Sequence, residues 1–192
     1  MKERGMIFNG EMVRAILDGR KTQTRRIVSP EPELTARSGF AWKGSIYGSG
    51  SSFRETSENF AHVACPFGKV GDRIWVRETF GDAGVRLVYR ADSNDGSACK
   101  VRRWTPSIHM PRQASRITME ITGVRVERLR DLTDECAVAE GAPKLEHLPY
   151  NPQDHKKART WFRGVWSGIY GEESWSSNPW VWVVEFKVVS DE

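Results

Sequence analysis

Residues 178–188 constrain the fold of this 192-residue chain more than any other stretch. Side chains alternate between the two faces of a β-strand. One face of this stretch would carry five large apolar residues: Trp180, Trp182, Val184, Phe186 and Val188. A strand with so much apolar surface has to be covered, so the pattern predicts a central strand of a sheet.

The neighbouring strands are expected in three other stretches. Apolar and polar residues alternate in residues 70–80, and again in residues 116–129 with a break at Gly123. A turn after the first of these stretches leads to a hairpin partner at residues 85–89.

Three helices are expected between and after the strands. Asn9 can cap a first helix that ends at Gly19, and Thr133 can cap a short one that ends before Gly141. A longer helix should begin at Asp154 and carry an apolar stripe: Ala158, Trp161, Phe162, Val165, Trp166 and Ile169. Many short strands with few helices predict an α+β domain built around a compact β-barrel.

Two stretches without clear periodicity are expected to be loops. Residues 29–68 contain two prolines and a Gly/Ser run, and residues 142–154 form the second loop. Four aromatic residues of the first loop either fix it to the core or form a lid over a site: Phe40, Trp42, Tyr47 and Phe53. Fixing the loop to the core is the simpler alternative.

The composition fits one domain with an anionic partner. With 39% hydrophobic and 28% charged residues, residues 1–192 can bury one substantial core. The net charge of +4 favours an anionic ligand without the charge density of a purely electrostatic binder. The sequence contains neither a signal-peptide pattern nor an apolar run of about 20 residues, so we expect a cytoplasmic protein with no membrane partner.

The cysteines indicate a reducing compartment. Cys65, Cys99 and Cys136 are odd in number and far apart, which does not fit a disulfide framework. His62 and Cys65 resemble half of a zinc site, and the other half would have to come from Cys99 and His109 in space. We therefore expect neither a metal nor a cofactor.

A basic segment joins the first helix to the strand that follows it. Residues 19–26 contain four cations and two hydroxyl groups, which suits phosphate binding and proton transfer on nucleic acid or nucleotides. Thr22 and Thr24 would share one face of an extended segment, and Lys21 could reach Thr24 only from the preceding turn. The alternative is a solvated basic edge that guards an exposed strand.

The short helix is expected to end at Glu140. A carboxylate at this end of a helix opposes the helix dipole by a few tenths of a kcal/mol to about 1 kcal/mol. Glu140 is therefore either exposed to solvent or retained for another purpose.

In four blocks the chain resembles the ASCH domain, a branch of the PUA-like superfamily, in the form carried by phages and prophages. The blocks lie at residues 19–25, 71–78, 132–141 and 180–187. The resemblance implies a small β-barrel flanked by helices, with a basic cleft suited to RNA or a nucleotide. Family members are mostly RNA-associated, and some look like enzymes.

Part of the chain is also similar to a bacterial amidohydrolase that removes an acetyl group from acetylated cytidine. The similarity covers residues 16–26 and 132–140 and implies a catalytic set of Lys21, Thr24 and Glu140. Lys21 would take the proton of Thr24 if burial or nearby cations lowered its pKa, and Glu140 would orient Lys21 or handle the proton of the leaving amine. In a ribonuclease, Glu140 would instead be the base acting on the ribose hydroxyl.

Further residues that bind nucleic acid or substrate are expected on the basic segment and on the strand at residues 70–80. They are Arg20, Thr22, Arg25, Arg26, Trp75, Arg77 and Glu78. Trp75 could stack on a base and Arg77 could bind phosphate, or both could be structural.

Three functions stay open. The slightly preferred one is hydrolysis of an acylated nucleoside or of RNA. The others are a non-catalytic nucleic-acid-binding module and a phage structural or assembly protein, which is least favoured because the sequence lacks heptads and repeats. The expected partner is RNA, a nucleotide or a modified nucleoside.

Overall fold

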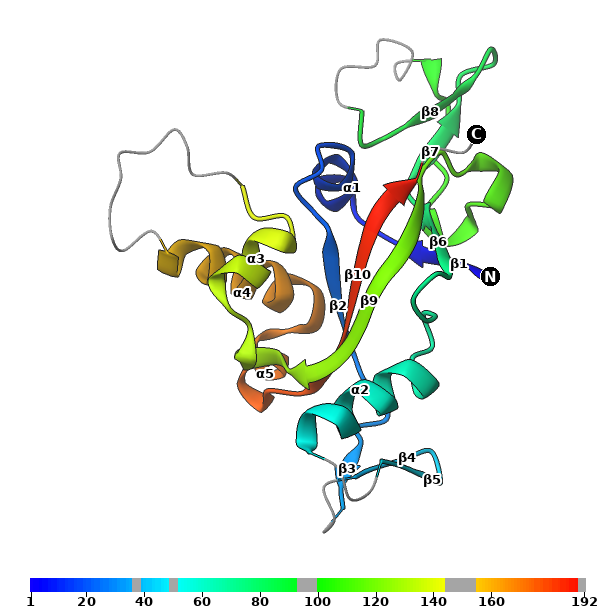
Figure 1. Ribbon diagram of the computed structural model, residues 1–192. Helices are drawn as coiled ribbons and strands as arrows, with labels where there is room; N and C mark the ends of the chain where they lie inside the picture. Colours follow the sequence, from blue (N-terminus) through cyan, green and yellow to red (C-terminus); the bar gives the residue numbers. More distant parts are fainter. Residues whose placement is uncertain (36–38, 49–51, 93–99, 144–154, 190–192) are drawn as a thin grey trace.

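The computed structural model describes residues 1–35, 39–48, 52–92, 100–143 and 155–189, and its centre is a mixed five-stranded sheet (Figure 1). In spatial order the strands are β1 (Glu3–Ile7), β6 (Arg73–Arg77), β9 (Thr118–Arg128), β10 (Trp180–Val189) and β2 (Gln23–Ile27). β1 and β6 run parallel, and the other neighbours are antiparallel. The predicted central strand is confirmed, since β10 lies between β9 and β2.

The longest pairing joins β9 to β10, and one bulge interrupts it. Glu185 pairs with Gly123, whereas Phe186 pairs with Ile121, so Thr122 is an extra residue on β9. The break predicted at Gly123 is therefore a β-bulge within one continuous strand.

Helices cover one side of the sheet and one of its ends (Figure 1). α1 (Gly10–Leu17) connects β1 to β2, and Asn9 caps it by accepting a hydrogen bond from the Met12 N–H at 2.8 Å. The helices beside β2 and β10 are α3 (Asp134–Ala139), α4 (His155–Tyr170) and α5 (Glu172–Ser177). The first two predicted helices are confirmed, and α5 is an addition. Asp154, the predicted cap of α4, lies outside the described residues.

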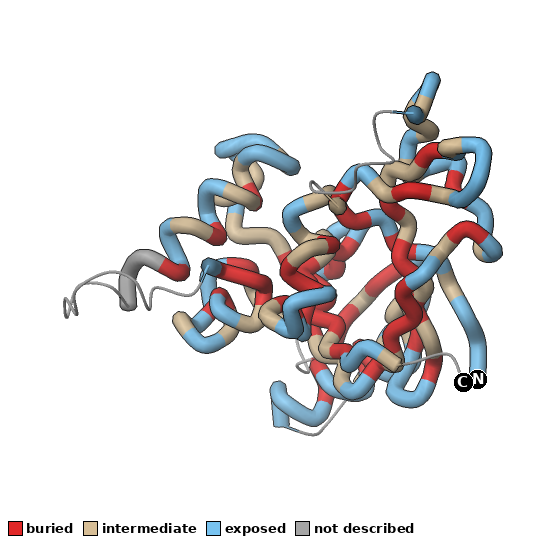
Figure 2. Tube along the Cα trace, turned by 90° about the horizontal axis from the view of Figure 1, so that it is seen from above, coloured by how far each residue is buried: buried red, intermediate tan, exposed pale blue. Residues whose placement is uncertain are grey.

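Buried residues follow the sheet and continue into the layer between the sheet and the helices (Figure 2). One cluster packs α4 against β10 and contains Phe162, Trp166 and Val183. Another joins α1 to β6 and contains Ile16 and Ile74. The predicted apolar stripe of α4 therefore faces the sheet, as its helical spacing requires.

The stretch at residues 29–68 is not a plain loop. Its described parts form β3 (Glu33–Leu34), β4 (Phe40–Trp42), β5 (Ser45–Tyr47) and α2 (Phe53–Ala64). The ring of Phe40 stacks on Phe60 at 4.8 Å, and Trp42 meets Trp182 of β10 edge to face at 5.8 Å. These aromatic residues fix the segment to the sheet, which is the packing alternative rather than the lid.

The ends of the sheet approach each other without joining. Backbone pairing among the described strands runs in one row from β1 to β2 and does not connect these two edges. Arg26 on β2 donates a hydrogen bond to the Ile7 carbonyl on β1 at 2.8 Å, so a single side chain spans the gap. The α+β class is confirmed, and closure into a barrel stays a prediction.

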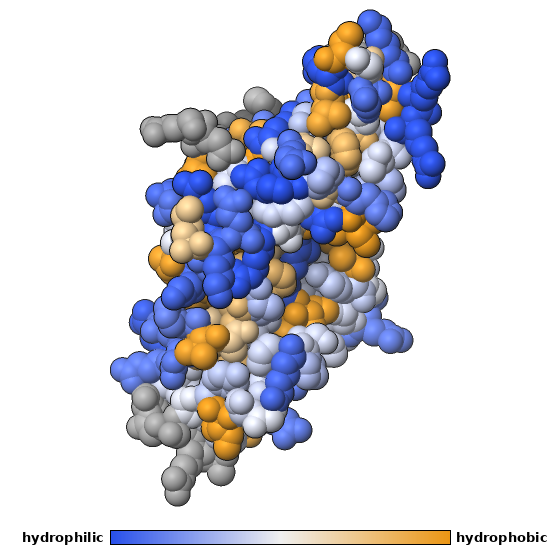
Figure 3. All heavy atoms as spheres, turned by 90° about the vertical axis from the view of Figure 1, so that its right-hand side faces the viewer, coloured by the Kyte–Doolittle hydropathy of each residue, from blue (hydrophilic) through white to orange (hydrophobic). Residues whose placement is uncertain are grey.

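A hairpin and a mixed surface complete the fold. β7 (Phe80–Asp82) and β8 (Leu87–Tyr89) pair as predicted for the stretch after residue 80. On the face shown in Figure 3, apolar residues form separate small groups among hydrophilic ones. Within the described ranges, no helix combines the length and apolar content that crossing a membrane requires.

Candidate functional site

Lys21 and Glu140 form a buried ion pair where α3 ends and β2 begins. The Lys21 Nζ atom donates to Glu140 Oε2 at 2.8 Å, and to the carbonyls of Glu140 and Gln23 at 2.9 Å each. Lys21 is 2% exposed and Glu140 is 4% exposed. All three protons of the ammonium group therefore have an acceptor.

Local backbone geometry brings these two residues together. Gly19 has a φ of +69°, so the chain turns back after α1, and the Lys21 N–H bonds the Ala15 carbonyl at 2.9 Å. Lys21 then forms an isolated antiparallel bridge with Glu140, which is the C-cap residue of α3. Gly141 follows with a φ of +101°, a conformation that favours glycine.

The ion pair belongs to a larger network. Arg25 Nη1 donates to the second carboxylate oxygen of Glu140 at 3.0 Å, and Arg25 also pairs with Glu127. Glu127 in turn accepts from Arg125 at 2.9 Å. Burial lowers the pKa of Lys21, and the carboxylate of Glu140 opposes that shift. Two cations thus surround the carboxylate that the helix dipole disfavours.

Thr24 lies on the opposite face of β2 from Arg25. Thr24 pairs with Val184, which belongs to the cluster around α1 and β6, whereas Arg25 pairs with Val183, which packs against α4. Among the described residues, the Thr24 hydroxyl makes no hydrogen bond with Lys21, whose three acceptors are the carbonyls and carboxylate given above. The structure therefore brings together two of the three residues implied by the amidohydrolase.

The other predicted residues of the basic segment bind groups within the chain. Arg20 contacts the Asp18 carboxylate at 3.0 Å and the Gly141 carbonyl at 2.9 Å. Arg26, besides its bond to β1, lies over the Phe8 ring at 5.4 Å. Thr22 is exposed, and its N–H bonds the carbonyl at the end of α3. Arg20 and Arg26 thus stabilise the junctions on either side of Lys21.

The residues predicted on β6 separate into two places. Arg77 lies over the Trp75 ring at 5.4 Å and donates to the Ile108 carbonyl. A Cβ atom at Gly5 would lie 2.6 Å from the Trp75 ring, so this ring covers the neighbouring strand β1. Glu78, just beyond β6, is 2% exposed and lines a cavity.

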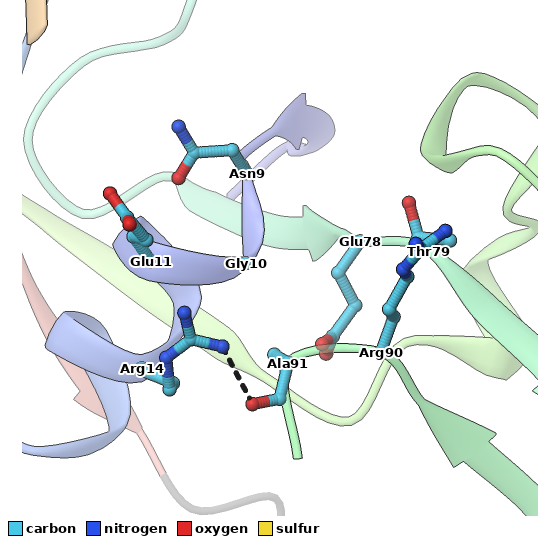
Figure 4. A pocket seen from close by; sticks show the side chains of 8 residues that line it. All are labelled: Asn9, Gly10, Glu11, Arg14, Glu78, Thr79, Arg90 and Ala91. Carbon is cyan, nitrogen blue, oxygen red and sulfur yellow. Dashed lines mark hydrogen bonds between the residues drawn. The ribbon is translucent and has the colours of Figure 1, made fainter. Parts of the chain in front are cut away.

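That cavity has a volume of about 380 Å³ and opens beside the N-terminus of α1 (Figure 4). Eight residues line it: Asn9, Gly10, Glu11, Arg14, Glu78, Thr79, Arg90 and Ala91. In Figure 4, Arg14 and Glu11 lie on one side, Thr79 and Arg90 on the other, and the Glu78 carboxylate lies between them. Sequence reasoning singled out Glu78 and missed both arginines.

Hydrogen bonds hold the charged groups of the cavity in place. Arg14 Nη1 donates to the Ala91 carbonyl at 3.0 Å. Arg116 donates to both Glu78 oxygens, at 2.9 and 3.2 Å, and to both oxygens of Asp92, each at 2.8 Å. Burial raises the pKa of Glu78, and Arg116 counteracts the rise. The cavity can therefore offer guanidinium groups to an anion and a carboxylate to a donor.

Comparisons with known proteins give one likeness. No protein-family model matches the chain, and a search of curated proteins finds no match. Among solved structures, the chain is similar to the crystal structure of the ASCH domain from Lactobacillus crispatus JV V101. The match covers 97% of this chain and 79% of that one, with 12% identity and a TM-score of 0.47. At this identity, the likeness does not reach individual side chains.

The space next to Glu140 is much smaller than the cavity of Figure 4. A recess of about 20 Å³ is lined by Glu140, Gly141 and Trp161 together with residues of α1. That volume is enough for about one water molecule. A nucleotide cannot enter it without a rearrangement of α1 or α4.

The cysteines and the half zinc site were also located where possible. In the part of the chain that the structure describes, Cys65 and Cys136 are free, and no three His, Cys, Asp or Glu residues are grouped to hold a metal ion. Cys99, the proposed zinc partner, lies outside the described residues.

Proposed function

We propose that this chain is an ASCH-type domain, with a PUA-like barrel, that binds RNA or a nucleotide in the cavity of Figure 4. The observation that carries the proposal is the pair of guanidinium groups, Arg14 and Arg90, that line this cavity with Glu78 between them. Its volume of about 380 Å³ is within the range of about 300–1,000 Å³ that small-molecule sites occupy.

The phosphate of a nucleotide suits the arginine side of the cavity. Arginine binds phosphate through charge-assisted hydrogen bonds, and Arg14 is already oriented by its bond to the Ala91 carbonyl. Asn9, Gly10 and Glu11 lie at the positive end of the α1 dipole, which also favours an anion. The net charge of +4 is compatible with the same partner.

Binding of AMP and adenosine to purified protein tests this assignment. We expect AMP to bind more tightly than adenosine, and Arg14→Ala and Arg90→Ala each to weaken AMP binding about tenfold or more, since hydrogen bonds to charged groups contribute about 1.5–3 kcal/mol. Arg54→Ala on α2 is the matched control, because Arg54 pairs with Glu58 on an exposed helix face. Equal affinity of the wild type for AMP and adenosine would remove the phosphate from this cavity.

RNA gives a second measurement on the same variants. If Arg14 and Arg90 contact phosphates, affinity for a short single-stranded RNA should fall as salt rises, and each substitution should reduce the slope of log K against log salt by roughly 0.7. Binding that is indifferent to salt would contradict phosphate recognition.

Hydrolysis is the second candidate, and one observation favours it. Lys21 is buried against Glu140 at 2.8 Å, and burial lowers the pKa of its amine, as a lysine base requires. For this chemistry, Lys21 would have to lose a proton that now bonds an acceptor, and Thr24 would have to come within reach from the other face of β2. The binding function needs neither change, so the geometry supports it better.

Matched variants at Thr24 separate the two candidates. Purified protein is incubated with acetylated cytidine and, separately, with labelled RNA. If Thr24 is the nucleophile, Thr24→Val removes product formation and Thr24→Ser retains it, while both keep the fold because Val is isosteric with Thr. Activity that survives in Thr24→Val would exclude this nucleophile, and an inactive wild type would leave binding as the function.

A further inference from the structure

Glu78 is a buried acid in the wall of a cavity that the arginines make suitable for an anion. Its side chain is 2% exposed, and it still lines the space between α1 and the end of β8 (Figure 4). A carboxylate at this depth needs hydrogen-bond donors. Arg116 supplies them from outside the set of lining residues, with bonds of 2.9 and 3.2 Å.

The clamp by Arg116 leaves Glu78 with acceptor capacity. A carboxylate has about four lone-pair positions, and Arg116 occupies one on each oxygen. Arg116 is shared, because Asp92 binds the same guanidinium through two bonds of 2.8 Å. Two carboxylates and one guanidinium carry a net charge of −1, so this side of the cavity attracts a further donor.

The position of the clamp is also fixed. The Arg116 guanidinium lies 4.0 Å above the Tyr89 ring, and the Tyr89 hydroxyl donates to the Ala114 carbonyl at 3.0 Å. Stacking and hydrogen bonding together hold Arg116, and Arg116 holds Glu78. The acceptor that faces the cavity is therefore preorganised, which reduces the entropy lost when a ligand binds.

We propose that Glu78 is a specificity-determining residue that accepts a hydrogen bond from the exocyclic amino group of a nucleobase, adenine N6 or cytosine N4. The inference rests on the proposed function, since Arg14 and Arg90 hold the phosphate of the same ligand. Hypoxanthine and uracil carry a carbonyl oxygen at the corresponding positions. That oxygen would face a carboxylate and leave a buried acceptor unpaired, so the cavity rejects these bases.

The test compares two matched pairs of ligands on the wild-type protein. AMP and IMP differ in the exocyclic group of the purine, and CMP and UMP differ at the equivalent edge of the pyrimidine. Titration calorimetry should give about tenfold tighter binding of AMP than of IMP, and of CMP than of UMP. This comparison needs no substitution, so it does not depend on whether a variant folds.

Glu78→Gln then assigns the preference to this residue. The amide can donate to a carbonyl oxygen, so we expect IMP and UMP to bind more tightly than they bind the wild type, and both ratios to fall toward one. Glu11→Gln, the other acid that lines the cavity, is the control and should keep both ratios. The thermal melting curve of each variant shows that it is folded.

The outcomes separate the inference from the function on which it rests. Binding of all four nucleotides with equal affinity would overturn the role of Glu78 and leave the phosphate site intact. Preferences that persist in Glu78→Gln would assign the discrimination to another residue and overturn the inference as well. Failure of every nucleotide to bind would overturn the proposed nucleotide site, and the inference with it.

Discussion

The carboxylate of Glu140 lies 2.8 Å from the amine of Lys21, and the two residues are 119 positions apart in the chain. This contact explains why an acid occupies the C-terminal end of α3, where the helix dipole disfavours it. Lys21 and Arg25 supply two cations to its two oxygens. The pair also ties the junction between α1 and β2 to the end of α3, so its first role is to hold these elements together.

Substitution of one partner of this pair should destabilise the fold strongly. Glu140→Gln or Lys21→Met leaves a buried charge without its partner, which typically costs about 3–5 kcal/mol. The free energy of unfolding, measured with urea, checks this value. Arg54→Ala, which breaks an exposed pair on α2, should change it by less than about 1 kcal/mol. Equal effects at the two sites would mean that the buried network is not structural.

Gly141 should tolerate a side chain less well than Gly19. Both have positive φ values, +101° and +69°, so alanine is strained at either position by about 1–2 kcal/mol. At Gly141 the new Cβ would also lie 3.0 Å from the Ala15 Cβ, whereas at Gly19 it meets nothing within 4 Å. We expect Gly141→Ala to lower the free energy of unfolding by a further 1–3 kcal/mol or so. A larger loss in Gly19→Ala would contradict this packing.

The aromatic packing of the segment at residues 29–68 predicts that it contributes to stability. Phe60 is fully buried and touches Phe40, Trp42 and Trp182, so Phe60→Ala should cost about 3–5 kcal/mol. Phe53 is 48% exposed, and Phe53→Ala should cost clearly less. Chemical unfolding of both variants measures the difference. A segment that acted only as a lid would give small losses in both.

Asp72 should make stability depend on pH in the acid range. Hydrogen bonds from the N–H groups of Lys2 and Lys69, together with Arg4, hold the pKa of Asp72 below its ordinary value of 3.8. A carboxyl whose pKa is lower in the folded state stabilises the fold above that ordinary value, and this contribution is lost as pH falls through the folded-state pKa.

Unfolding of the wild type and Asp72→Asn over a range of pH tests this dependence. The wild type should be more stable at neutral pH, and its advantage should shrink steadily below pH 3.8. An advantage that does not change with pH would show that the carboxylate charge of Asp72 contributes nothing.

Local signals in the sequence were sufficient for α1, α3 and β10. Asn9 and Thr133 are capping residues, and both accept the backbone hydrogen bonds expected of them. α2 could not be predicted in the same way, because its buried face includes Thr56 and Ser57 and so lacks a clear apolar stripe. Its position depends on aromatic contacts with distant strands, which no local pattern specifies.

The candidate sites show the same division. The contact between Lys21 and Glu140 was implied by a family resemblance and by no spacing in the chain, since the two residues lie on different elements. Arg14 and Arg90 could not be singled out, because an arginine that lines a cavity looks the same in sequence as one that faces solvent. Only the packing of α1 beside β8 creates the space between them.

The bond from Arg26 to the Ile7 carbonyl has a consequence for self-association. β1 and β2 are the edges of the sheet, and the unpaired backbone groups of an edge strand can add a strand from another molecule. Arg26 brings a charge across this gap and uses one of the carbonyls that an incoming strand would need. The same side chain that nearly closes the sheet therefore protects the protein from polymerising edge to edge.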